Sequence, residues 1–158
     1  MKVIKNLNKE NISSICKLIS NEKDFEIFFK LGWNMSNLEN QLIKKNNFSI
    51  GYFFNKKLIG ILIGEKILNE DNKFSLEIHI IYVPKIYRRK YIASDILDFI
   101  IKNKKSNKIS KLYLEVSELN EVAIKFYEKN SFVFCNFRLN YYTNNNKKIN
   151  EKFYYKVV

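Results

Sequence analysis

One segment of the chain decides the fold: FSLEIHIIYVPKIYRRKYIASDILDFIIKNKKSNKISKLYLEV, residues 74–116. Its first ten residues have the composition of a strand, Pro84 ends that strand, and a basic turn leads into a helix over about 93–104. Its last six residues alternate polar and apolar side chains, which predicts a second strand. A strand, a helix and a strand in this order form a crossover unit, so the two strands are predicted to be parallel.

Weaker patterns on both sides of this unit complete a mixed α/β sheet. Upstream, two apolar runs flank residues 55–57 as a hairpin, and Asn8 and Ser36 can cap helices. Downstream, Asn120 can cap another helix. The predicted elements are a strand at 2–4, a helix at 9–20, an aromatic-rich run at 24–33, a helix after Ser36 with Leu38, Leu42 and Ile43 inward, strands at 48–54 and 58–67, a helix from 120 to about 130, and closing strands at 132–139 and 152–158.

Composition limits the class of protein. The chain has 158 residues, of which 46% are apolar, enough for one domain with a core. Only four glycines and one proline are present, which argues against a disordered chain. Two distant cysteines exclude a disulfide scaffold and a four-thiolate zinc site. With no apolar run long enough to span a membrane and a polar start, we expect a soluble, cytoplasmic protein with a single domain, 1–158.

The formal net charge is +12, most of it from lysine. Such a charge can indicate a nucleic-acid or phosphate partner. Lysine is spread along the whole chain and no RNA-binding motif is evident, so the charge is interpreted as a solvated surface that favours anionic ligands. The most polar tract, 144–152, is predicted to be a surface loop. We expect no membrane association and no direct nucleic-acid binding.

Residues 83–94, VPKIYRRKYIAS, form a strand end, a basic turn and a helix N-terminus. This geometry points backbone N–H groups at an anion, with arginine and lysine alongside, and it suits a pyrophosphate. From these features alone, an ordinary strand-to-helix turn is an equally good interpretation.

Two sequence stretches resemble a known family. RRKYIA, residues 88–93, is similar to the acetyl-CoA-binding turn of the GNAT acetyltransferases, Arg/Gln-x-x-Gly-x-Gly/Ala, with Tyr91 where the family has glycine. LYLEVSELNEVAIKFYEKNSF, residues 112–132, is similar to the second family signature, and FRLNYY, residues 137–142, extends the match. The chain most resembles the RimI branch, the N-alpha-acetyltransferases of a small-subunit ribosomal protein.

The resemblance implies a GNAT fold, with a mixed, mostly antiparallel sheet, a central parallel strand pair and about four helices. It implies acetyl-CoA as the acetyl donor, no metal, and a protein N-terminus, that of a ribosomal protein in this branch, as acceptor. Glu115 matches the general base and Tyr127 the general acid. The residues matching the acetyl-CoA site are Ile81, Tyr82, Val83, Arg88, Arg89, Lys90, Tyr91, Ile92, Ala93, Ser94 and Asn120. Those assigned to the acceptor are Trp33, Glu77, Tyr141 and Tyr142.

Each of these residues also has a plain structural interpretation. Glu115 alternates with apolar neighbours and is typical of a solvated strand surface. Tyr127 has the helical spacing of a core aromatic, Asn120 that of an N-cap, and Tyr141 with Tyr142 that of a hairpin aromatic pair. Tyr91 can present the N–H of the family's glycine only at a negative φ or with strain.

Three other functions remain open on the sequence: a GNAT acetyltransferase for lysine side chains or a small amine, a non-catalytic acyl-CoA-binding module, and a basic RNA-binding domain. His79, the only histidine, is interpreted as a core or surface residue rather than a ligand. Cys16 lies on an apolar helix face and is predicted to be core, and no local signature supports a Cys/His hydrolase with Cys135.

Overall fold

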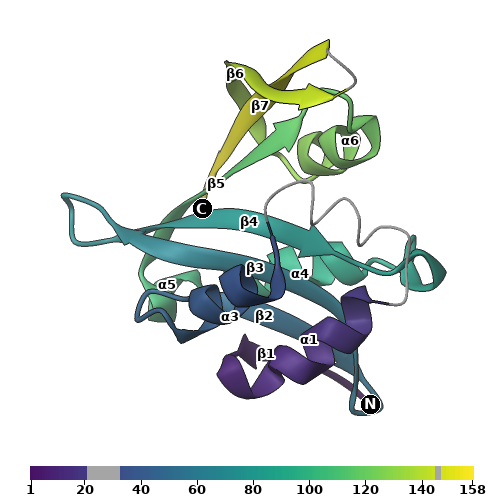
Figure 1. Ribbon diagram of the computed structural model, residues 1–158. Helices are drawn as coiled ribbons and strands as arrows, with labels where there is room; N and C mark the ends of the chain where they lie inside the picture. The colour runs from purple at the N-terminus through teal and green to yellow at the C-terminus, as the bar shows by residue number, and fades with distance from the viewer. Residues whose placement is uncertain (21–32, 145–146) are drawn as a thin grey trace. The chain divides into compact units, whose positions relative to one another are not determined.

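The computed structural model describes residues 1–20, 33–144 and 147–158, with 140–144 and 147–148 described by their backbone alone (Figure 1). Of the predicted aromatic-rich run at 24–33, residues 24–32 lie outside the described residues. In chain order the elements are β1 (Lys2–Leu7), the 3-10 turn η1 (Lys9–Asn11), α1 (Ile12–Ile19), α3 (Met35–Ile43), β2 (Ser49–Phe54), β3 (Lys57–Leu68), β4 (Phe74–Tyr82), the 3-10 turn η2 (Lys85–Tyr87), α4 (Ile92–Lys102), α5 (Lys104–Asn107), β5 (Ile109–Ser117), α6 (Glu121–Lys129), β6 (Val133–Asn144) and β7 (Lys147–Val157).

The strands form a mixed seven-stranded sheet in the order β1-β2-β3-β4-β5-β7-β6. The predicted parallel pair is confirmed: β4 and β5 run parallel, from Phe74 opposite Ile109 to Ile78 opposite Leu114. The hairpin of β2 and β3 is also confirmed, and Asn55 and Lys56 make its turn with positive φ. The predicted α/β class and its mostly antiparallel sheet are therefore correct.

The chain divides into two compact units. The first contains residues 1–66 and 80–103, and the second contains residues 67–79 and 104–158. In the first unit, α1 and α3 pack on one face of the strands through a cluster that includes Ile15, Leu38, Ile61 and Ile63. On the opposite face Gly60 lies against Ile92, the first residue of α4. Strand β3 is therefore buried on both faces over most of its length.

The second unit is built on β5, whose side chains alternate as predicted. Leu112, Leu114 and Val116 are buried, whereas Glu115 is exposed. Leu114 pairs in register with Tyr154 of β7, and the Tyr154 hydroxyl donates to Glu128 of α6 at 2.9 Å. Because direct partners in a ladder share a face, α6 covers the face of β5 that carries Leu114. Glu115 lies on the opposite face.

Several sequence predictions are corrected. The cap of α3 is Asn34, whose side chain accepts from the N–H of Asn37 at 2.8 Å, because Asn34 is extended and Ser36 already lies in the first turn. Ile43 ends that helix and is exposed. The tract 144–152 is not a loop over most of its length, because residues 147–152 belong to β7. Ile149 and Glu151 are buried in that strand, so the polar composition of the tract does not indicate an exposed loop.

Candidate functional site

The turn before α4 has an unusual backbone. Tyr91 is the N-cap of the helix with φ 59° and ψ 10°, and Arg89 has φ 59°. Both lie in the left-handed region that glycine occupies readily and other residues rarely do. The Tyr91 side chain is directed outward, and the residue is 74% exposed. Tyrosine thus retains a glycine-like conformation, with strain.

The N-terminus of α4 has no side-chain cap. The helices α3 and α6, in contrast, are capped by the side chains of Asn34 and Asn120. The first N–H groups of a helix have no partners within the helix, and the helix dipole adds a positive partial charge there. The N–H groups at the start of α4 are therefore suited to an anion such as a phosphate.

Two contacts hold this turn in place. The Nε of Arg88 donates to the backbone carbonyl of Val83 at 2.8 Å, which ties the turn to the end of β4. A Cβ on Gly60 would come within 2.6 Å of the Ile92 Cγ2 atom, so the absence of a side chain there lets α4 begin close against β3. Both contacts lie within the first unit.

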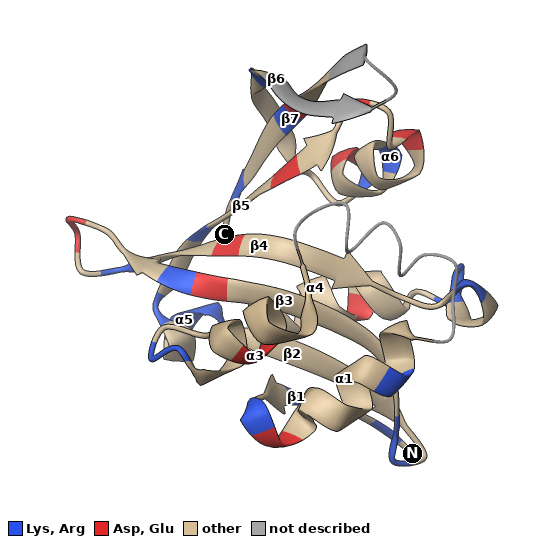
Figure 2. Cartoon of the chain, in the orientation of Figure 1, with Lys and Arg blue, Asp and Glu red and all other residues tan. Residues whose placement is uncertain are grey.

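Basic side chains surround the same turn. Lys85, Arg88, Arg89 and Lys90 are all exposed. The Nζ atoms of Lys57 and Lys90 each lie 5.8 Å from the centre of the Tyr87 ring, within the range of a cation–π contact. In Figure 2 basic segments occur in both units and include this turn. The local field therefore attracts an anionic ligand.

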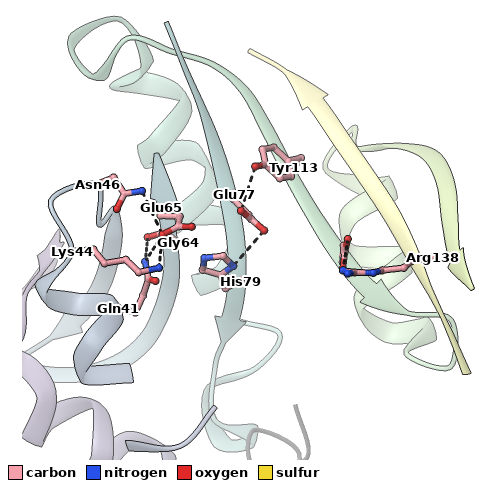
Figure 3. A network of polar contacts seen from close by, with 10 residues as sticks. Gln41, Lys44, Asn46, Gly64, Glu65, Glu77, His79, Tyr113 and Arg138 are labelled. Carbon is pink, nitrogen blue, oxygen red and sulfur yellow. Dashed lines mark hydrogen bonds and ion pairs between the residues drawn. The ribbon is translucent and has the colours of Figure 1, made fainter. Parts of the chain in front are cut away.

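In the second unit, Glu115 has an accessible carboxylate. Its side chain is 34% exposed, and Arg138 Nη1 lies 3.1 Å and 3.4 Å from the two carboxylate oxygens (Figure 3). The sequence argument did not identify Arg138, although it lies within the FRLNYY segment. The exposure of Glu115 fits both a surface residue and a proton acceptor.

Glu77 belongs to a polar cluster on β4 and β5. The hydroxyl of Tyr113 donates to Glu77 Oε2 at 3.3 Å, and His79 Nδ1 lies 3.8 Å from Glu77 Oε1 (Figure 3). Tyr113 is the register partner of Glu77 in the parallel ladder, which explains the contact. Glu77 and Glu115 thus come from adjacent strands.

Tyr127 is buried on α6. Its ring packs against Phe126 and Phe132, with ring centres 5.4 Å and 5.6 Å away. Burial raises the pKa of Tyr127 above the ordinary value for a phenol, because the charged phenolate loses its hydration. Like an ordinary phenol, the hydroxyl is protonated at neutral pH, and its raised pKa makes it a weaker acid than a solvated phenol.

The other predicted site residues are distributed as follows. Asn120 caps α6 by accepting from the N–H of Ala123 at 3.1 Å. Trp33 packs against the core cluster of the first unit and, with Cys16 and Met35, lines a small apolar cavity. The remaining ones are placed by element: Ile81 and Tyr82 end β4, Val83 follows it, Ile92, Ala93 and Ser94 begin α4, and Tyr141 and Tyr142 lie on β6.

Comparisons with known proteins agree with this fold. A model described as the acetyltransferase (GNAT) family matches residues 14–132. That match covers most of the chain, so this protein belongs to the GNAT acetyltransferase family. A comparison with the sequences of curated proteins finds no match. No helix in the described part of the chain is both long and apolar enough to cross a membrane.

Three solved structures illustrate the likeness. The ribosomal-protein-S18-alanine N-acetyltransferase from Escherichia coli has a TM-score of 0.83 at 18% identity, covering 100% of this chain and 94% of that one. Arabidopsis thaliana NAA60 in complex with a bisubstrate analogue has a TM-score of 0.80 at 15% identity, covering 99% of this chain and 98% of that one. Arabidopsis thaliana Naa50 with the bisubstrate analogue CoA-Ac-MVNAL has a TM-score of 0.77 at 22% identity, covering 98% of this chain and 97% of that one. At these identities the likeness establishes the shared fold.

Proposed function

We propose that this acetyltransferase transfers the acetyl group of acetyl-CoA to the α-amine of a protein N-terminus, and that a ribosomal protein beginning with alanine is its acceptor. The solved structures of similar fold include one named a ribosomal-protein-S18-alanine N-acetyltransferase and one of Naa50 with the bisubstrate analogue CoA-Ac-MVNAL. The segments at 112–132 and 137–142 resemble the same branch. These two likenesses support the choice of acceptor.

The pyrophosphate of acetyl-CoA binds, in this proposal, at the turn before α4. Backbone N–H groups of residues 89–94 hold the phosphate oxygens, and Tyr91 supplies its N–H in the left-handed conformation with its ring turned outward. Residues 81–83 pair with the pantetheine arm through their backbone, and Asn120 adds a contact. Trp33, Glu77, Tyr141 and Tyr142 hold the acceptor.

The accessible carboxylate of Glu115 and the buried phenol of Tyr127 are the two groups of the proposed mechanism. In the second unit, Glu115 lies on one face of β5, and α6, which bears Tyr127, covers the other. The accessible carboxylate of Glu115 is the group assigned to take a proton from the acceptor amine, and the phenol of Tyr127 is the group assigned to the departing sulfur.

Each proton and bond is accounted for in a direct transfer. An α-ammonium has a pKa of about 7.7–8.0, so Glu115, directly or through one water, takes a proton that is already loosely held. The amine nitrogen then forms a bond to the acetyl carbon, and the C–S bond breaks. Tyr127 gives its proton to the departing thiolate, and the products are the acetylated peptide and CoA.

The test is acetyl transfer to a short peptide that begins with the ribosomal alanine and also contains an internal lysine, followed by mass spectrometry. We expect one acetyl group on the N-terminus and none on an amine-blocked peptide. Acetylation of lysine alone, with acetyl-CoA bound, would refute the N-terminal acceptor. Failure to bind acetyl-CoA would refute the enzyme and favour a module of other function.

Two variants test the assigned roles. Glu115→Gln and Tyr127→Phe should each lower kcat by about 100-fold or more, the usual contribution of a positioned acid or base. Glu121→Gln is the matched control, because Glu121 is an exposed carboxylate on α6 and its ion pair with Lys125 lies at the surface. Wild-type rates in Glu115→Gln would remove Glu115 from the mechanism.

A further inference from the structure

Arg138 and Glu115 lie on strands that are not neighbours. The sheet order is β5-β7-β6, so β7 separates the two residues. Phe153 of β7 is the register partner of Glu115 on one side and of Asn136 on the other. Adjacent strands are about 4.8 Å apart, so the two backbones are about 10 Å apart. The Arg138 side chain therefore reaches across β7 to contact the carboxylate.

Glu151 carries a second carboxylate and lies opposite Arg138 in the ladder of β6 and β7. It is the register partner of Arg138 on β6 and of Ser117 on β5, and it is buried. Arg138 thus contacts the accessible carboxylate of Glu115 and lies opposite the buried Glu151 in the ladder. A guanidinium group, with several donors in a rigid plane, suits the contact to both oxygens of Glu115 better than an ammonium does.

We propose that Arg138 is a positioning residue for acetyl transfer, which holds the Glu115 carboxylate in the orientation from which it accepts the proton of the acceptor amine. This inference rests on the proposed role of Glu115. A glutamate side chain that is 34% exposed would otherwise sample several rotamers. The two contacts from Arg138 Nη1 to both oxygens restrict it.

The pair contributes little to folding, which separates positioning from structural support. The Arg138 side chain is 56% exposed, and exposed ion pairs stabilise proteins weakly. Arg138→Gln should therefore shift the Tm by no more than about 3 °C. It should lower kcat by about tenfold, equivalent to about 1.4 kcal/mol, with the KM for acetyl-CoA unchanged. Arg138→Lys keeps the charge but loses the planar set of donors, so it should recover only part of the lost rate.

A double-mutant cycle with Glu115→Ala tests whether Arg138 acts through Glu115. Rates of the four proteins are measured at about pH 7, where most of the α-amine is protonated and the base is needed, with enough enzyme to measure the residual rate of Glu115→Ala. In the Glu115→Ala background, Arg138→Gln should change kcat by less than about twofold. An equal loss in both backgrounds, or no loss in the wild type, would overturn the proposal.

A second measurement does not depend on the acceptor. The chain has three arginines, so the side-chain Nε–H signals in an NMR spectrum are few and can be assigned by substitution. We expect the Arg138 signal to move in Glu115→Ala and to stay in place in Glu121→Gln. An unchanged signal would refute the pair itself. If the proposed function is wrong, the wild type transfers no acetyl group to the peptide, but the Arg138 signal still moves in Glu115→Ala.

Discussion

Replacing Tyr91 by glycine should stabilise the protein, although it removes a large side chain. Tyr91 has φ 59°, and a left-handed conformation costs a residue with a Cβ about 1–2 kcal/mol. Glycine removes that cost but gives the unfolded chain more freedom, worth about 0.4–1 kcal/mol. The Tyr91 residue is 74% exposed, so little packing is lost. The net gain is about 0–1.6 kcal/mol, with a midpoint of about 0.8 kcal/mol, or up to about 6 °C in Tm for a chain of this size.

Thermal unfolding followed by circular dichroism measures this difference, and Tyr91→Ala is the matched control. Alanine also removes the ring but keeps the Cβ, so it should give no rise in Tm. A lower Tm for Tyr91→Gly would show that the ring makes contacts that stabilise the fold. An equal rise for glycine and alanine would show that Tyr91 carries no backbone strain, and the description of the turn would be wrong.

Two further substitutions test packing and burial. Gly60→Ala places a Cβ about 2.6 Å from Ile92, and overpacking of this kind costs about 1–3 kcal/mol. Both the Tm and the affinity for acetyl-CoA, measured by calorimetry, should therefore fall. An unchanged Tm would contradict the close approach of β3 and α4. Burial and the hydrogen bond to Glu128 raise the pKa of Tyr154 to about 12, which favours its protonated form in the folded state. That stabilisation is complete below the unfolded pKa of about 10 and is lost as the pH rises toward 12, so unfolding curves from pH 9 to 12 should converge for the wild type and Tyr154→Phe. Parallel curves would refute the shift.

The central crossover was predictable because its signals are local. Pro84 ends β4, the alternation around Glu115 defines β5, and the Asn120 cap is a single side-chain contact. The cap of α3 was misassigned, since Asn34 and Ser36 are both good caps and only the backbone angles distinguish them.

The Arg138 contact could not be predicted, for a different reason. It depends on which residue of β6 faces which residue of β7, and that register shifts between Phe134 and Asn136. No periodic pattern in the sequence fixes such a shift. Similarly, the sequence left two backbone conformations open for Tyr91, and the structure has the strained one.

The N–H groups at the start of α4 have a kinetic consequence in the proposed reaction. Backbone donors and exposed lysines and arginines recognise phosphate, and phosphate is the same in acetyl-CoA and in the CoA that leaves. Interactions shared by substrate and product strengthen binding without speeding the chemical step. CoA should therefore be a strong product inhibitor that competes with acetyl-CoA. Added salt screens the basic charge of the turn, so it should weaken inhibition by CoA to the same extent as it slows the binding of acetyl-CoA.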